Sequence, residues 1–307
     1  MQRRTFIKVS GLAAAGTTLT GAAMGTGSQT GYKTITAADV NSYLRSLCEV
    51  KEPSVDRVII GNPETPVTRI GTCWMPYWKT LRKAVDHGVN TIVVHEPTFY
   101  THWDLEAKEA EYTQGTEAGK EAYLKTIDQK KQWINDQGLV IIRCHDVLDI
   151  VPEFGVPFAF GQALGFTNKD IIRSKKYFNV YQMDSTPAIE AARLIAGKLK
   201  SADQAGVAFY GDPNYPVSAL GLGTGCACDP LDFMDMDADL YVAIDDTIRT
   251  WTQSTFAEDS GKPLVVINHG TSEEFGVRLL RDQLGKAFPA YQVEHFSQGC
   301  GYRWVSA

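Results

Sequence analysis

The sequence predicts an α/β protein of two related lobes, each built on a mostly parallel sheet. Short apolar runs alternate with helical segments from residue 36 to the end of the chain. Several of these runs lack polar alternation, which is typical of strands buried on both faces of a parallel sheet. The 307 residues are 44% hydrophobic and 21% charged, the composition of a chain that forms a core.

Charge and cysteine content exclude several classes of protein. The formal net charge is −6 and lysine and arginine occur only in short groups, so no nucleic-acid partner is expected. Cys73 and Cys144 lie in apolar runs and are expected to be buried thiols, whereas Cys226 and Cys228 are too close for an unstrained disulfide. A structural zinc site made of cysteines is not expected, because no C-x-x-C pair occurs.

Residues 1–30 are predicted to be an export signal. Arg3 and Arg4 precede a weakly apolar run, Val9–Met24, rich in alanine, glycine and threonine. This resembles a twin-arginine signal, which carries folded proteins across the bacterial inner membrane, so we expect a periplasmic or exported protein. The run is too short and glycine-rich for a stable span, and we expect no stable membrane anchor. The mature chain then covers residues 31–307.

The first lobe is expected at about residues 31–165. Apolar residues at helical spacing, ended by glycines such as Gly88 and Gly138, predict its helices, and short β-branched runs predict its strands. A polar segment, His102–Gly119, interrupts the pattern. The expected helices are Ala37–Leu47, Tyr77–His87, Glu121–Asp136 and Phe158–Gly165, and the expected strands are Val67–Trp74, Thr91–Val94 and Leu139–Arg143.

The second lobe, about residues 166–307, repeats this pattern. Its Gly221–Asp246 segment resembles Gly71–Glu96 in its order of strand, helix and strand, which is why we expect related lobes. The expected strands are Phe178–Gln182, Val207–Phe209, Ala219–Leu222, Leu240–Ile244, Leu264–Ile267 and Gln292–Phe296. The expected helices are Pro187–Leu199, Thr247–Glu258 and Glu273–Ala287.

Imidazole and carboxylate side chains follow four of the buried strands. They occur at His95-Glu96, at His145-Asp146 with Asp149, at Asp245-Asp246, and at Asn268-His269 with Glu273. Sites in open α/β sheets gather beyond the carboxyl ends of the strands. Three of the six histidines lie there, and imidazole with carboxylate is a donor set for a divalent metal. We therefore expect a metal centre in the cleft between the lobes.

Three motifs resemble those of the Nif-three-like family, whose members are described as hexameric proteins with a dinuclear metal centre, many labelled GTP cyclohydrolase 1 type 2. His95–Phe99, preceded by Gly88–Val94, is similar to the family's gly-ala-asp-x-ile-ile-x-his-his-pro-leu-phe. His145–Asp149 is similar to his-thr-asn-leu-asp, and His269–Val277 to his-tyr-ala-thr-glu-arg-glu-gly-val. The motifs keep the family's order across nearly the whole mature chain.

The resemblance implies a set of ligands and two departures. The implied metal ligands are His95, Glu96, Asp149, His269 and Glu273. Glu96 stands where the family has its second histidine, a harder donor set that suits manganese or iron better than copper. Trp74-Met75 stands where the family commonly has an aspartate. We expect one or two divalent ions per chain (iron, manganese or zinc) and, by resemblance, a homo-hexamer.

Each ligand also has a structural interpretation. Glu96 could face solvent, and Asp149 could cap a helix that starts after Ile150. Thr271-Ser272-Glu273-Glu274 fits a capping box in which Thr271 caps the helix and Glu274 reaches back, which leaves Glu273 free to face the metal.

Two further histidines are candidates for catalysis. His145 could move a proton or orient Asp149, although its position next to the ligand loop favours a structural role, and His102 could line the cleft. The glycine run Gly221–Gly225 lacks the spacing of a dinucleotide site, so we expect a tight turn near the cleft.

Three functions are compatible with the sequence, and the first two are favoured over the third. The first is a metal-dependent, cyclohydrolase-like hydrolase acting on an unidentified small ring, ester or amide substrate. An exported protein meets little free GTP, which disfavours that substrate. The second is a non-enzymatic, ring-forming protein that binds metal or scaffolds a partner. The third, a metal-free pair of solute-binding lobes, predicts no metal after purification.

Overall fold

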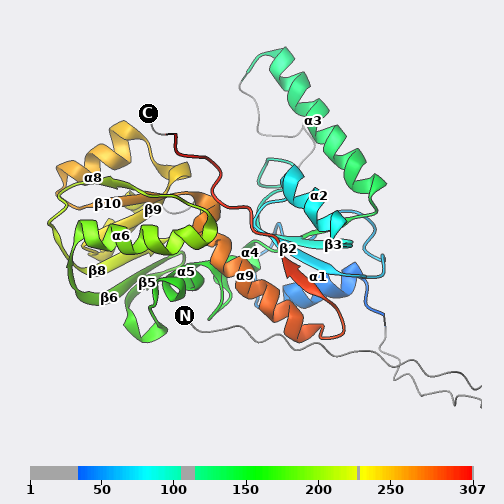
Figure 1. Ribbon diagram of the computed structural model, residues 1–307, viewed down its shortest axis with the longest axis horizontal. Coiled ribbons are helices and arrows are strands. Elements are labelled where there is room, and N and C mark those ends of the chain that lie inside the picture. Colours follow the sequence, from blue (N-terminus) through cyan, green and yellow to red (C-terminus); the bar gives the residue numbers. More distant parts are fainter. Residues whose placement is uncertain (1–33, 105–114, 227–228, 306–307) are drawn as a thin grey trace, which may run out of the picture. The chain divides into compact units, whose positions relative to one another are not determined.

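The computed structural model describes residues 34–104, 115–226 and 229–305. The predicted export signal at residues 1–30 therefore lies outside the described residues. Within the described part of the chain, no helix has the length and apolar character needed to cross a membrane. The elements form two sheets with helices around them, as the α/β prediction requires (Figure 1).

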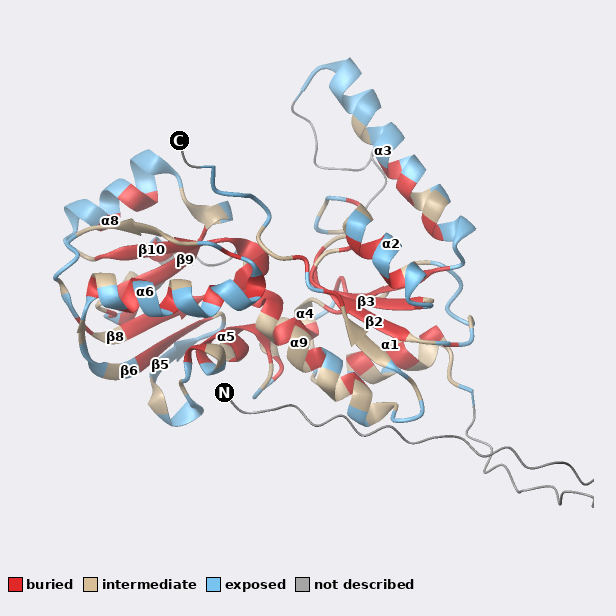
Figure 2. Cartoon of the chain, viewed as in Figure 1, coloured by how far each residue is buried: buried red, intermediate tan, exposed pale blue. Residues whose placement is uncertain are grey.

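The first sheet has five strands in the order β1-β4-β3-β2-β11. All neighbours are parallel except the edge strand β1, which is antiparallel to β4. Every residue of β2, β3 and β4 is buried, which confirms the prediction drawn from their apolar runs (Figure 2). The strands are β1 (Val58–Ile60), β2 (Ile70–Cys73), β3 (Thr91–Val94), β4 (Val140–Arg143) and β11 (Val293–His295).

Helices cover both faces of this sheet. Val93 packs with α1 and α9 on one face, whereas its neighbours Ile92 and Val94 pack with α2 and α3 on the other. This alternation follows from the opposite directions of successive side chains along a strand. The helices are α1 (Ala37–Ser46), α2 (Trp78–Asp86), α3 (Glu117–Asp136), α4 (Asp146–Ile150) and α9 (His269–Ala287).

The second sheet has six strands in the order β5-β6-β8-β9-β10-β7. Its centre, β8-β9-β10, is parallel, and the other strands are antiparallel to their neighbours. The strands are β5 (Ile171–Lys175), β6 (Phe178–Pro187), β7 (Ala208–Tyr210), β8 (Pro216–Gly223), β9 (Leu240–Ile244) and β10 (Leu264–Ile267). The helices are α5 (Val156–Leu164), α6 (Ala188–Leu199), α7 (Pro230–Phe233) and α8 (Thr255–Asp259), with a π-turn at Thr250–Ser254 and 3₁₀ turns at Asn168–Asp170, Lys200–Ala202, Met234–Met236 and Asp245–Thr247.

The two segments predicted to be related have the same local arrangement. In β2-α2-β3 and in β8-α7-β9, a helix connects two strands that lie side by side and parallel. Such a connection needs a helical crossover, because parallel strands cannot be joined by a tight turn. The resemblance between the two sequence segments thus corresponds to a shared supersecondary unit of strand, helix and strand.

Several expected boundaries differ from the structure. The last strand, β11, pairs with β2, so the end of the chain returns to the first sheet instead of completing the second lobe. Strand β5 was not predicted, because all but one of its residues are exposed and it shows no apolar pattern. The helix predicted at Thr247–Glu258 is instead a 3₁₀ turn, a π-turn and the short α8.

Candidate metal centre

The candidate ligands lie on three connections between strands and helices. His95 and Glu96 follow β3, Asp149 lies in α4 after β4, and His269 and Glu273 belong to the first turns of α9 after β10. Strands β3 and β4 come from the first sheet and β10 from the second. The structure brings all five predicted ligands together, with α9 passing between the two sheets (Figure 1).

These five residues form two groups of three that share one carboxylate. In the first, His95 Nε2 lies 3.2 Å from Glu273 Oε2 and 3.6 Å from Asp149 Oδ1. In the second, His269 Nε2 lies 3.1 Å from Glu273 Oε2 and 3.3 Å from Glu96 Oε1. The donor atoms of each group lie within 4.8 Å of one another, so each could hold a metal ion, with Glu273 between them.

The partners of the two imidazoles define which nitrogen faces the centre. Nδ1 of His95 lies 3.2 Å from the carbonyl oxygen of Cys144, which can only accept, so Nδ1 carries the proton. Nδ1 of His269 lies 2.7 Å from Asp246 Oδ2. Both Nε2 atoms are buried and lack a hydrogen-bond partner among the described residues. A histidine that binds a metal through one ring nitrogen typically makes a hydrogen bond with the other, and this bond orients the ring.

The charges of the candidate ligands strongly shift one another's pKa values. Burial opposes protonation of His95, but Glu273, Asp149 and Glu96 outweigh burial and raise its pKa to about 10. The pKa of His269 is also raised, because Glu273 and Asp246 outweigh its burial. Burial raises the pKa of Asp149 to about 6, although His145 and His95 oppose that shift. A divalent cation would replace the protons on the imidazoles as the positive charge among these carboxylates.

The structure contradicts the two helix-capping roles considered for Asp149 and for Thr271–Glu274. It supports the tight turn predicted for the glycine run. Asp149 lies inside α4 instead of capping a later helix. The capping box at Thr271–Glu274 is wrong, because α9 already begins at His269 and Glu274 accepts from His295. Gly225 occupies a tight turn with φ +72°, and a Cβ there would lie 2.7 Å from Glu273 Oε1. That turn lies at the centre, as predicted for the glycine run.

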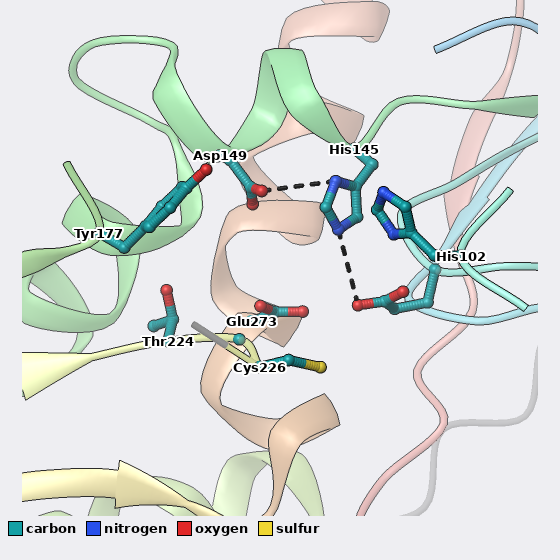
Figure 3. Close-up of a pocket in the computed structure, with 9 residues that line it drawn as sticks. His102, His145, Asp149, Tyr177, Thr224, Cys226 and Glu273 are labelled. Carbon is teal, nitrogen blue, oxygen red and sulfur yellow. Dashed lines mark ion pairs between the residues drawn. The ribbon is translucent and has the colours of Figure 1, made fainter. Parts of the chain in front are cut away.

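A cavity of about 220 Å³ opens beside the two groups, and we call it the site cavity (Figure 3). His145 lies between Asp149, at 3.4 Å, and Glu96, at 3.9 Å, and its ring stacks on that of His95. His102 lines the cavity edge-on to His145 but belongs to neither group of candidate ligands. The remaining lining residues are Tyr177, Thr224, Gly225, Cys226 and Glu273.

Comparison with known proteins identifies the family. The model of the Duf34/NIF3 (NGG1p interacting factor 3) family matches residues 38–299, most of the chain. The chain belongs to the Duf34/NIF3 family. Among solved structures, a Bacillus cereus protein related to NIF3 aligns with a TM-score of 0.68 at 14% identity, covering 90% of this chain and 100% of that one. No curated protein matches the chain.

Two further structures show the same fold. The Staphylococcus aureus protein SA1388 aligns with a TM-score of 0.65 at 18% identity, over 89% of this chain and 100% of that chain. Reduced HcgD from Methanocaldococcus jannaschii aligns with a TM-score of 0.61 at 16% identity, over 87% and 99%. The family and the two residue groups together make this a NIF3-family protein with a candidate metal centre.

The two residues expected to depart from the family's motifs, Glu96 and Trp74, both lie at the centre. Glu96 is buried and directs Oε1 toward His269, so it does not face solvent. Trp74 donates from Nε1 to Glu273 Oε2 at 2.7 Å and packs edge-on against His269. The indole thus helps to orient the shared carboxylate.

Three residues near the centre were not predicted. Arg143 is buried and reaches Glu96, Tyr177 lines the cavity, and Cys226 Sγ lies 3.8 Å from His269 Nδ1. Arg143 could have been found from the sequence, because it is a charged residue at the end of the apolar run Leu139–Arg143. The other two lie on loops, where the sequence pattern gives no direction for a side chain.

Proposed function

We propose that this NIF3-family protein binds two divalent metal ions per chain at the centre and uses them to hydrolyse a small molecule. The observation that supports it most is the pair of buried Nε2 atoms of His95 and His269, both directed at the shared carboxylate of Glu273. Imidazole and carboxylate donors fit zinc, manganese or iron. Two such ions would supply Lewis acidity to the substrate and to water.

Residues outside the two ligand groups would manage the protons. Nδ1 of His145 lies 3.0 Å from Asp146 Oδ1, and Nε2, which lies 3.9 Å from Glu96 Oε1, would exchange a proton in the site cavity. Partial burial and the nearby Arg143 lower the pKa of His102, so this ring is neutral at pH 7 and can accept a proton. Both histidines line the cavity, so both are within reach of a substrate held there.

Elemental analysis of the purified protein and of two neighbouring variants tests the proposal. Glu273 and Glu274 are both buried, but Glu273 faces the centre whereas Glu274 accepts from His295 Nε2 at 2.8 Å. We expect about two ions per wild-type chain, loss of both in Glu273→Gln because it removes the shared ligand, and wild-type content in the matched control Glu274→Gln. Equal metal content in the two variants would contradict the assignment.

Turnover is tested separately from metal binding. The metal-loaded wild type and His145→Ala are compared against a panel of small esters, amides and cyclic amidines, with metal content measured for each sample. We expect hydrolysis by the wild type, and a loss of roughly 10²–10⁴-fold in His145→Ala if that ring moves a proton. Two bound ions with no hydrolysis of any panel member would favour a non-enzymatic metal-binding role instead.

The setting in the cell and the assembly complete the proposal. We propose export by the twin-arginine pathway, because a folded protein could load its metal before transport, and assembly as a homo-hexamer. The support for export is the Arg3-Arg4 pair before the apolar run, and the support for the hexamer is the family resemblance. Light scattering of the purified chain tests the hexamer, and a monomer at micromolar concentration would contradict it.

A further inference from the structure

A second cavity adjoins the site cavity. It also has a volume of about 220 Å³, and we call it the side cavity. His102 and Tyr177 line both cavities, so the two are neighbours that share part of a wall. Ligand pockets of proteins have volumes of roughly 300–1,000 Å³, a size that the two cavities reach only together. A ligand that fills both would therefore extend from the metal centre into the side cavity.

The side cavity has a positive rim. Lys51 and Lys176 both line it, the first from the loop after α1 and the second from the turn between β5 and β6. Both side chains are exposed, and neither makes an ion pair with another residue in the described part of the chain. Nζ of Lys176 lies 4.5 Å from the centre of the Tyr177 ring, which keeps this cation beside the shared wall.

One carboxylate, that of Asp146, also lines the side cavity, and both of its oxygens already have hydrogen-bond partners. Asp146 Oδ1 lies 3.0 Å from His145 Nδ1, and Oδ2 accepts from the Val55 amide at 3.2 Å. The two lysines thus outnumber the one carboxylate that lines the side cavity. Cations in a partly enclosed cavity attract a ligand of opposite charge.

Two aromatic side chains lie in the wall beside the apolar residues Val50, Pro53 and Ile150. Trp103 and Tyr177 line the side cavity together with His102. Flat rings of this kind contact the face of a planar ligand and leave the polar edge of that ligand free to meet charged groups. The wall thus combines ring-binding surfaces with two cations.

We propose that the side cavity binds the anionic, non-reacting part of a substrate with a planar ring, and so identifies the substrate class of the proposed hydrolase. The inference rests on the proposed function for the reacting end of that substrate, which would lie in the site cavity. The anion is a carboxylate or a phosphate, since ammonium groups bind both. Contacts to a part of the substrate that does not react also hold the reacting part in position.

The test uses phenyl phosphate and benzoate as ring-bearing anions and benzyl alcohol as the neutral probe. Calorimetry measures their binding to the full chain as purified and after treatment with a chelator, with metal content determined for both samples. We expect the anions to bind more tightly than benzyl alcohol in both samples, because the lysines remain when the metal is removed. The tighter of the two anions identifies whether the substrate carries phosphate or carboxylate.

A charge-matched pair of double variants locates the binding. Lys51→Glu with Lys176→Glu should weaken anion binding by about tenfold or more at low salt. Lys198→Glu with Lys200→Glu makes the same change of net charge at exposed residues that line neither cavity, and should stay within about twofold of wild type.

Two results would overturn the inference. One is anion binding that is unchanged by the Lys51 and Lys176 substitutions, and the other is anion binding that disappears with the metal, which would place the anion on the ions. A wild-type chain without metal would contradict the proposed function alone, since the chelated sample still reports on the side cavity.

Discussion

Arg143 Nη2 lies 3.4 Å from Glu96 Oε2, and both side chains are buried. The other carboxylate oxygen of Glu96, Oε1, faces His269 Nε2. Arg143 also donates to the main-chain oxygens of His95 and His102, so it fixes the loop that follows β3. The chain thus supplies a buried cation to Glu96, one of the five candidate metal ligands.

Glu96 and Arg143 are expected to be energetically coupled. Removing one partner of a buried ion pair leaves an uncompensated charge and costs ~3–5 kcal/mol, so Arg143→Met should lower the free energy of unfolding by that order. In Glu96→Gln with Arg143→Met the combined loss should be smaller than the sum of the single losses. Urea denaturation of the metal-free protein measures the cycle.

An exposed ion pair provides the control for this cycle. Arg173 and Asp237 lie 3.3 Å apart with exposed side chains, so their coupling should be at most ~1 kcal/mol. A coupling between Glu96 and Arg143 no larger than this would mean that the guanidinium stabilises the protein through its other partners, the main-chain oxygens and the buried Asp104.

Glu96→His is predicted to change the preferred metal. A third imidazole would replace a hard carboxylate, which should shift the preference from manganese toward zinc. Glu96→Ala should lower the metal content by about one ion per chain, because the second group keeps only His269 and Glu273. Loading with equal manganese and zinc, followed by elemental analysis, measures this. The same metal ratio and amount in all three proteins would show that Glu96 binds no metal.

Metal affinity is predicted to rise with pH. In the metal-free protein the pKa of His95 is raised to about 10, so at pH 7 the ring holds a proton that the metal must displace. Affinity should then increase by about tenfold per pH unit for each displaced proton, up to about pH 10. Below about pH 6 the dependence should steepen, because Asp149, with a pKa of about 6, must also lose a proton.

Calorimetry in two buffers with different protonation enthalpies measures the protons released. His102→Ala serves as the control, because His102 lies outside both ligand groups and its loss should leave the number unchanged. Heats that do not depend on the buffer at pH 7.5 would mean that the imidazoles are neutral before the metal binds.

Export is predicted to depend on both residues of the arginine pair. Changing Arg3 and Arg4 to lysine keeps the charge but removes the guanidinium groups that define the signal, so the protein should remain uncleaved in the cytoplasm. Immunoblots of periplasmic and cytoplasmic fractions measure this, with Lys8→Arg as a control that keeps the pair. Unchanged periplasmic yield would argue against the twin-arginine pathway.

Much of the centre was readable in the sequence because its ligands follow apolar strands. Thr91–Val94, Leu240–Ile244 and Leu264–Ile267 are strands with the predicted bounds, and every one of their residues is buried. Burial on both faces requires an unbroken apolar run, which a single sequence displays directly. Polar residues at the ends of such runs then indicated His95 and His269.

Only the tertiary structure decided how these pieces meet. The first turns of α9, from His269 to Glu274, are polar yet buried, so no apolar periodicity marked the start of that helix. The pairing of β11 with β2 and the inward direction of Arg143 depend on contacts between residues far apart in the chain. Local patterns record which side chains avoid water, whereas the sharing of Glu273 between two imidazoles follows from packing the two sheets against one helix.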